Sequence, residues 1–262
     1  MSRLDALFAA CRAEGRAALI GYLPVGFPSY QSSVDAMLAM VEGGVDLVEV
    51  GVPYSDPGMD GPVIQVAVDA ALRGGTKVAQ VFDAVRAVSA VAPTVVMGYW
   101  NPVERLGPRR FATLLAESGG SGAITPDLIP EEAGAWLDAA TEQDLAPVFL
   151  VAPSSTDARI EVVGRTNRGF VYAASTMGVT GTRDAVSDRA EELVRRVRTS
   201  TELPVCVGLG VSDGAQAAEV AAYADGVIVG SAFVRALDDG GPDAVRALAQ
   251  DLASGVRGPG RS

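Results

Sequence analysis

Short apolar runs alternate with amphipathic stretches along the whole chain. Each apolar run is almost continuous in Val, Ile, Leu and Ala, which is typical of strands covered on both faces. The amphipathic stretches repeat apolar residues at the three- and four-residue spacing of helices. The predicted strands are Ala18–Leu23, Asp46–Gly51, Thr94–Tyr99, Gly122–Thr125, Pro147–Val151, Gly169–Ala174, Pro204–Gly208 and Gly226–Val229.

Amphipathic helices are predicted after these strands. Strands that each lead into a helix favour a parallel sheet with right-handed crossovers. In 262 residues, the expected solution is an α/β fold, a single (β/α)8 TIM barrel with extra N-terminal and loop helices. An open doubly wound sheet is the alternative, because periodicity does not distinguish the two. The predicted helices are Gln31–Glu42, Val63–Leu72, Val78–Val91, Arg109–Ser118, Glu131–Glu142, Asp157–Arg165, Asp188–Ser200, Asp213–Tyr223 and Val245–Ala253.

The chain shows no linker that would divide it. Pro and Gly fall singly at the ends of predicted elements, where they act as turns and caps. We therefore expect one domain over residues 1–262, with residues 255–262 as a frayed tail.

The charge balance and the absence of histidine narrow the possible chemistry. The chain has 32 acidic and 21 basic residues and a formal net charge of −11. This negative charge repels phosphate backbones, so no nucleic-acid partner is expected. With no histidine, Ser-His-Asp and Cys-His nucleophiles and histidine-ligated zinc are excluded. Proton transfer must fall to carboxylates, Lys, Tyr, Cys or water.

Cysteine usage and the N-terminus predict a cytoplasmic protein. Cys11 and Cys206 fit no metal-ligand spacing and are expected to be buried and reduced, with a disulfide as the alternative. Charged residues interrupt every short apolar stretch of residues 1–23, unlike a signal peptide. No apolar run reaches the ~18 residues that a membrane span requires, so no membrane association is expected.

A carboxylate lies inside the second predicted strand. With a period of two, Leu47, Glu49 and Gly51 share one face of that strand, and Val48 and Val50 share the other. The helix-covered face takes the valines, so Glu49 is expected to point into the barrel mouth. Burial there would raise its pKa and fit it for proton transfer near neutral pH. The alternative is a structural Glu paired with Arg or Lys inside the barrel.

The loop at residues 52–62 follows that strand and carries three prolines and two glycines. It leads into a helix near Pro62, a favourable first helical residue. Taken alone, Asp56 and Asp60 read as turn formers or helix caps. Beside Glu49, Asp60 becomes a candidate second acid–base group, because carboxyl groups in unlike environments can divide donor and acceptor roles.

Glycines at the ends of the last two strands predict a phosphate site. Gly210 and Gly230 would let an anion approach the backbone closely. Ser231 adds a hydroxyl at a helix N-terminus, whose dipole favours negative charge. Loops after strands seven and eight of such barrels often bind phosphate. A small phosphorylated metabolite is therefore the expected ligand, and plain turns or caps are the alternative.

Other residues near the strand ends are weaker candidates. Tyr22, Trp100 and Phe149 could wall an aromatic substrate or simply pack, and Tyr172 could reach a substrate hydroxyl or sit in the core. Gly178 and Gly181 could be hinges of a closing lid or a plain turn. The candidate substrate-binding residues are Tyr22, Trp100, Tyr172, Thr180, Gly181, Gly210, Gly230 and Ser231.

Lys77 is the only lysine in the chain. It lies at a predicted helix start, away from the barrel mouth, which disfavours Schiff-base chemistry.

The segment Leu47–Pro57, followed by Asp60–Pro62, closely resembles the hallmark of the tryptophan synthase alpha chain family. Residues 21–28 and 123–130 are also similar to that family, and the likeness runs from about residue 4 to residue 252 in order and at matching spacing. Residues 178–181 resemble the family's mobile loop, and Gly210 with Gly230 and Ser231 resembles its phosphate site.

The resemblance implies retro-aldol cleavage of indole-3-glycerol phosphate to indole and glyceraldehyde 3-phosphate, in tryptophan biosynthesis. It implies that Glu49 serves the proton transfers and that Asp60 faces the indole N–H. It also implies no metal or organic cofactor in this chain and a beta-chain partner that uses pyridoxal phosphate, in an alpha2-beta2 heterotetramer. Loops around Pro53 and Asp56, and after the sixth strand, would couple the two sites.

One departure from the family's pattern bears on the order of the loop that carries Asp60. Many family members carry Leu and Ala where this chain has Gly58 and Met59. Gly58 should loosen the loop by about 0.5–1 kcal/mol, so we expect the partner or substrate to order Asp60. The alternatives are another barrel enzyme, which would need metal ligands or a catalytic lysine, and a non-enzymatic subunit, which would lack Glu49 or Asp60.

Overall fold

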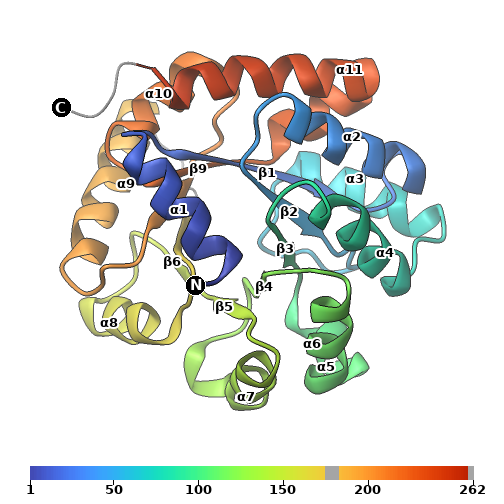
Figure 1. Cartoon of the computed structure of the whole chain (residues 1–262), viewed down its shortest axis with the longest axis horizontal. Coiled ribbons are helices and arrows are strands. Elements are labelled where there is room, and N and C mark those ends of the chain that lie inside the picture. The colour runs from blue at the N-terminus through green and yellow to red at the C-terminus, as the bar shows by residue number, and fades with distance from the viewer. Residues whose placement is uncertain (175–182, 259–262) are drawn as a thin grey trace.

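A sheet of parallel strands curves into a nearly closed barrel surrounded by helices (Figure 1). The computed structural model describes residues 1–174 and 183–258, with residues 183–187 described by their backbone alone. The strands in it are β1 (Ala18–Pro24), β2 (Leu47–Gly51), β3 (Thr94–Met97), β4 (Gly122–Ile124), β5 (Ala146–Val148), β6 (Leu150–Val151), β7 (Val171–Ala174), β8 (Val205–Gly208) and β9 (Gly226–Val229). Their order is β5-β4-β3-β2-β1-β9-β8-β7-β6.

The fifth predicted strand is interrupted at Phe149, which divides it into β5 and β6. The Phe149 N–H donates to the side-chain oxygen of Asn167 at 3.0 Å. The Asn167 amide donates in turn to the carbonyls of Phe149 and Phe170. A buried side chain thus satisfies the backbone that leaves the ladder. Because β5 and β6 are halves of one strand, the nine segments correspond to the eight predicted strands, and the TIM barrel prediction is confirmed.

The helices cover the outside of the barrel, apart from α1 (Figure 1). Those of the described chain are α1 (Arg3–Ala13), α2 (Tyr30–Glu42), α3 (Pro62–Arg73), α4 (Val78–Ser89), α5 (Trp100–Leu106), α6 (Pro108–Glu117), α7 (Gly134–Glu142), α8 (Asp157–Thr166), α9 (Arg183–Arg198), α10 (Gly214–Ala221) and α11 (Ser231–Val256), with a 3-10 turn η1 (Pro130–Glu132).

Two helical regions differ from the sequence-based prediction. The helix expected at residues 131–142 is divided into η1 and α7. The last helix begins at Ser231, and its two halves join across Gly241, whose φ of +67° is non-helical. It also extends through Gly255 and Val256, into the expected tail, because Gly255 packs directly against the backbone of Gly214. Residues 259–262 lie outside the described chain.

The barrel has two separate apolar cores. In the interior core, Leu4 and Phe8 of α1 pack with Leu47 and Phe170 near the start of the strands. Helix α1 therefore closes the end of the barrel opposite the strand C-termini. Cys11 and Cys206 are both buried and free in this core, as predicted.

The outer core lies between the strands and the surrounding helices. It contains Val48 and Val50, whereas Leu47 belongs to the interior core. This placement confirms the predicted division of β2 into two faces and directs Glu49 inward.

A buried ion pair ties the closed end of the barrel together. The Arg16 guanidinium donates to both Asp46 oxygens, at 2.8 and 3.0 Å. Asp46 also accepts the backbone N–H of Leu19, at the neighbouring strand β1, at 2.8 Å. The two charged side chains are only 13% and 10% exposed. The carboxylate that precedes β2 is thus fully engaged in holding two strands in place.

Candidate active site

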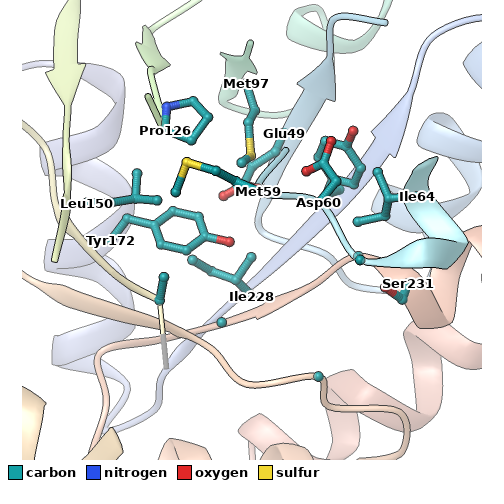
Figure 2. Close-up of a pocket in the computed structure, with 16 residues that line it drawn as sticks. Glu49, Met59, Asp60, Ile64, Met97, Pro126, Leu150, Tyr172, Ile228 and Ser231 are labelled. Atoms are coloured by element: carbon teal, nitrogen blue, oxygen red, sulfur yellow. The ribbon is translucent and has the colours of Figure 1, made fainter. Parts of the chain in front are cut away.

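The C-terminal ends of the strands surround a cavity of about 210 Å³. Figure 2 shows its side chains converging from several strands and from the loop after β2. The lining includes both candidate acids and five of the candidate substrate-binding residues, namely Glu49, Asp60, Tyr22, Tyr172, Gly210, Gly230 and Ser231. The structure therefore brings together residues that are up to 209 positions apart, from Tyr22 to Ser231.

Glu49 is a buried carboxyl group without a balancing charge. Its side chain is 0% exposed, and neither carboxyl oxygen accepts a hydrogen bond within the part of the chain that the structure describes. Burial raises its pKa to about 8. Among the described residues, no Arg or Lys lines the cavity with it. The described part of the chain therefore offers no cation for the alternative of a structural Glu paired inside the barrel.

Asp60 reaches the same cavity from the loop at residues 52–61, here called loop two. Burial raises its pKa to about 6, and a hydrogen bond with Tyr99 acts in the opposite direction. Helix α3 begins at Pro62 as predicted, but its N-cap is Gly61 and no side chain caps it. Asp60 is thus not a helix cap, and its carboxyl group is available to the cavity.

Two tyrosine rings pack directly against glycines at the ends of strands. A Cβ atom at Gly51 would lie 2.5 Å from the Tyr22 hydroxyl oxygen, and one at Gly208 would lie 3.0 Å from that of Tyr172. A side chain at either glycine would displace the ring beside it. Burial, together with the charges of Glu49 and Asp60, raises the pKa of both phenols well above 10. Both hydroxyls therefore stay protonated; Figure 2 shows that of Tyr172 directed into the cavity.

The part of the cavity wall formed by the ends of β8 and β9 has the features expected for an anion site. Gly210 has a φ of +71° and open space around the position of a Cβ atom. Gly230 is the N-cap of α11 and Ser231 is its first residue, and both line the cavity, so the N-terminus of this helix lies at the cavity wall. Thr180 and Gly181, and the expected hinge at Gly178, lie outside the described residues.

Trp100 does not line the cavity. Strand β3 ends at Met97, two residues earlier than predicted, so Trp100 starts α5 instead of following a strand. Its N–H donates to Asp127 at 2.8 Å, and its ring packs against the outer core. Phe149 is 1% exposed in the same core. In the described structure both aromatics pack in the outer core and neither lines the cavity, so the suggested substrate wall is not seen there.

Much of the apolar wall was missed by sequence reasoning. Met97, Leu150 and Ile228 point inward from β3, β6 and β9, and Met59 extends across the cavity from loop two (Figure 2). The alternation that placed Glu49 inside the barrel could also have identified the strand residues of this wall. Met97, for example, pairs in the parallel register with Gly51, which lies on the same face of β2 as Glu49. The position of Met59 depends on the path of the loop, which leaves no periodic signal.

The remaining expectations concern metal and membrane. In residues 1–174 and 183–258, no group of His, Cys, Asp and Glu side chains is arranged to hold a metal ion. None of the helices in these ranges combines the length and the apolar character of a membrane span. Lys77 is the exposed N-cap residue of α4 and is not part of the cavity lining.

Comparison with known proteins places this site in a family. The sequence profile of the tryptophan synthase alpha chain matches residues 8–256. The chain belongs to the tryptophan synthase alpha chain family. It is 61% identical over 257 residues to the alpha chain of Mycobacterium intracellulare, covering 98% of this chain and 95% of that one.

Solved structures agree with this assignment. A structure of Mycobacterium tuberculosis tryptophan synthase is similar with a TM-score of 0.94 and 57% identity, over 98% of this chain and 99% of that one. The tryptophan synthase alpha subunit of Legionella pneumophila is similar with a TM-score of 0.88 and 30% identity, over 98% of both chains.

Membership establishes the reaction. The chain is a carbon–carbon lyase that cleaves indole-3-glycerol phosphate to indole and glyceraldehyde 3-phosphate in tryptophan biosynthesis, as the alpha subunit of tryptophan synthase. The alternatives of another barrel enzyme and of a non-enzymatic subunit are thereby rejected. A beta chain is its partner.

Proposed function

We propose that Glu49 and Asp60 carry out the proton transfers of this cleavage and divide the work between them. The observation that supports the proposal is a fully buried carboxyl group with no partner among the described residues, which shares one small cavity with a second carboxyl group of lower pKa. Two acids in unlike environments can act as donor and acceptor at the same pH.

The chemistry assigns a role to each carboxyl group. Cleavage requires a proton at indole C3, loss of a proton from the glycerol hydroxyl next to the breaking bond, and stabilisation of positive charge on the indole nitrogen. With a pKa of about 8, Glu49 is mostly protonated at pH 7 and can supply the proton to C3. Its carboxylate can then take the hydroxyl proton as the carbon–carbon bond breaks, which restores the acid.

Asp60 suits the third requirement. With a pKa of about 6, it is mostly ionised at pH 7 and can accept a hydrogen bond from the indole N–H. That bond strengthens as the nitrogen becomes positive in the transition state, which is the kind of interaction that accelerates the step.

The rest of the substrate is assigned to the remaining walls. The phosphate would bind at Gly210, Gly230 and Ser231, where backbone N–H groups and the α11 dipole favour an anion. The rings of Tyr22 and Tyr172 would flank the indole and glycerol parts. We assign Thr180 and Gly181 to the loop that covers the bound phosphate, from the resemblance to the family's mobile loop.

The partner and cofactor assignments also belong to the proposal. We infer that this chain needs no metal or organic cofactor, because a retro-aldol step with two carboxyl groups balances its protons without one. Pyridoxal phosphate would reside in the beta chain, and the assembly would be an alpha2-beta2 heterotetramer in the cytoplasm. We further infer that residues 1–262 form one domain.

The test is indole release from indole-3-glycerol phosphate, by the chain alone and with a tryptophan synthase beta chain. Glu49→Gln and Asp60→Asn should each lower kcat by about 10²–10⁴-fold, the usual contribution of an acid–base group. Asp69→Asn is the matched control, because Asp69 is exposed on α3 in an ion pair with Arg73. Near-native turnover of folded Glu49→Gln would reject the assignment.

A further inference from the structure

The catalytic cavity has two chemically unlike ends. One end lies where β8 and β9 finish and includes the proposed phosphate site. The other is formed by apolar side chains from β3, from β6 and from just after β4, namely Met97, Leu150 and Pro126 (Figure 2). Other strands separate β3 and β4 from β8 and β9 in both directions around the barrel, so the two ends lie across the cavity from each other.

Indole-3-glycerol phosphate is divided in the same way. Its phosphate is charged and needs hydrogen-bond donors, whereas its indole ring is flat and apolar. A phosphate placed against Met97, Pro126 and Leu150 would lose its hydration and gain no donor from these side chains. The ring therefore belongs at the end formed by these three residues, here called the apolar end.

Met59 reaches the apolar end from a loop. Met97 pairs with Gly51 of β2, and Leu150 pairs with Tyr172 of β7, so strand pairing fixes both of these wall residues. Met59 is half-buried, belongs to loop two and extends across the cavity towards them (Figure 2). The size of the space left for the ring therefore depends on the Met59 side chain.

The backbone at Met59 is held on two sides. Its N–H donates to the Tyr99 hydroxyl at 2.9 Å, and the carbonyl of the next residue, Asp60, accepts a hydrogen bond from the Gln65 side chain at 2.8 Å. Tyr99 is only 6% exposed and is the N-cap of α5. The Met59 side chain thus enters the cavity from an anchored point on the loop.

The cavity leaves little spare room beside a bound ring. Its volume of about 210 Å³ is below the ~300–1,000 Å³ that is typical of pockets for small molecules. Methionine is unbranched and fills irregular space well. Its replacement by Ala would remove every side-chain atom beyond Cβ and lengthen the apolar end.

We propose that Met59 determines which indole rings the enzyme accepts, because its side chain closes the apolar end against substituents on the benzene ring. This inference rests on the proposed function, which places the phosphate at Gly210, Gly230 and Ser231 and so directs the ring towards Met59. It makes Met59 a specificity-determining residue with no part in proton transfer.

The test measures kcat/KM of the full chain, combined with a beta chain, for indole-3-glycerol phosphate and for analogues with one methyl group at each free position of the benzene ring in turn. One methylene in an apolar pocket changes discrimination by about 10- to 200-fold, so the native chain should reject at least one analogue by about 10-fold or more. Met59→Ala should weaken that rejection by about 10-fold. Met59→Leu, which nearly conserves the volume, should keep it.

Ile64→Ala is the matched control, because it shortens an apolar side chain at the other end of the same cavity. A Cβ atom at Gly230 would lie 3.5 Å from the Cδ1 atom of Ile64, so Ile64 borders the proposed phosphate site. This variant should leave the preference among the ring analogues unchanged.

The outcomes separate this inference from the proposed function. A native chain that accepts every analogue, or a Met59→Ala variant that keeps both the native preference and the native thermal stability, would overturn the role of Met59. The roles of Glu49 and Asp60 would then still stand on the turnover of their own variants. If Ile64→Ala widens the preference and Met59→Ala does not, the ring lies at the other end, and the proposed placement of the substrate fails together with this inference.

Discussion

Two carboxyl groups three residues apart show how differently the two ends of the barrel are built. Asp46, at the closed end, accepts two hydrogen bonds from Arg16 and one from the Leu19 backbone. Glu49, at the open end, accepts none within the described chain, although it is the more deeply buried of the two.

The difference separates stabilising groups from reactive ones. A paired and hydrogen-bonded buried carboxylate holds its surroundings in place, and removing its partner is costly. An unpaired buried carboxyl group avoids the cost of a buried charge by keeping its proton, which is the state a proton donor needs. The carboxylate at the closed end thus stabilises the fold, whereas burial of Glu49 at the open end costs stability and provides the protonated acid that its proposed role requires.

The largest expected effect is a pH-dependent loss of stability caused by Glu49. Its pKa is about 8 in the folded chain and near 4.5 in the unfolded chain, so between these values the folded state holds a proton that the unfolded state releases. Stability is therefore fully present below pH 4.5 and is lost as the pH rises towards 8. The slope is about 1.4 kcal/mol per pH unit, or roughly 4 kcal/mol from pH 5 to 8.

Denaturant unfolding of the native chain and of Glu49→Gln at several pH values measures this effect. The variant should lack that part of the slope and be more stable than the native chain at pH 8. Parallel stability curves for the two proteins would show that Glu49 has no raised pKa, and the contrast with Asp46 would disappear.

The next effect belongs to the closed end. Arg16→Met should lower the free energy of unfolding by about 3 kcal/mol, because it leaves the largely buried Asp46 carboxylate with only the longer contact to Arg257, at 3.7 Å. Because Arg16 is not among the residues that line the cavity, kcat should stay within about twofold for protein that is still folded. Arg73→Met, which breaks an exposed pair with Asp69, is the control and should cost under about 1 kcal/mol.

The smallest expected effect is a change in stability caused by Gly58, in loop two at the open end of the barrel. A Cβ atom at Gly58 would meet no heavy atom within 4 Å, and its φ is not in the left-handed region. Gly58→Ala should therefore stabilise the chain by about 0.4–1 kcal/mol by restricting the unfolded state. Gly75→Ala, at a φ of +83°, should destabilise it instead.

Hydrogen exchange at residues 53–60 tests the accompanying expectation that the partner or substrate orders loop two. Slower exchange is expected on adding both, and in Gly58→Ala without either. Equal protection of the native loop with and without them would contradict this expectation.

Periodic features of the molecule could be predicted from the sequence, and non-periodic ones could not. The strands and the inward direction of Glu49 follow from alternation, which local sequence encodes. The break at Phe149 depends on Asn167, 18 residues later, whose buried amide replaces the ladder. No local pattern at residues 147–151 predicts that contact.

The residues of the site also fall into predictable and unpredictable ones. The sequence identified Gly210, Gly230 and Ser231 because they lie at the ends of predicted strands. It identified Asp60 because this residue follows Glu49 in the hallmark segment. Trp100 was misplaced because β3 ends two residues early, at Met97. The same shift concealed Tyr99, which the pattern assigned to the strand and which instead precedes α5.

Closure of one end of the barrel by α1 also limits how substrate can enter and how products can leave. Leu4 and Phe8 fill the closed end of the interior core, so within the described residues the cavity is reached from the end of the barrel where the strands finish. Substrate must enter, and both products must leave, by the rim formed by the strand C-termini and their loops. Whichever surface covers that rim therefore controls both the entry of substrate and the departure of products.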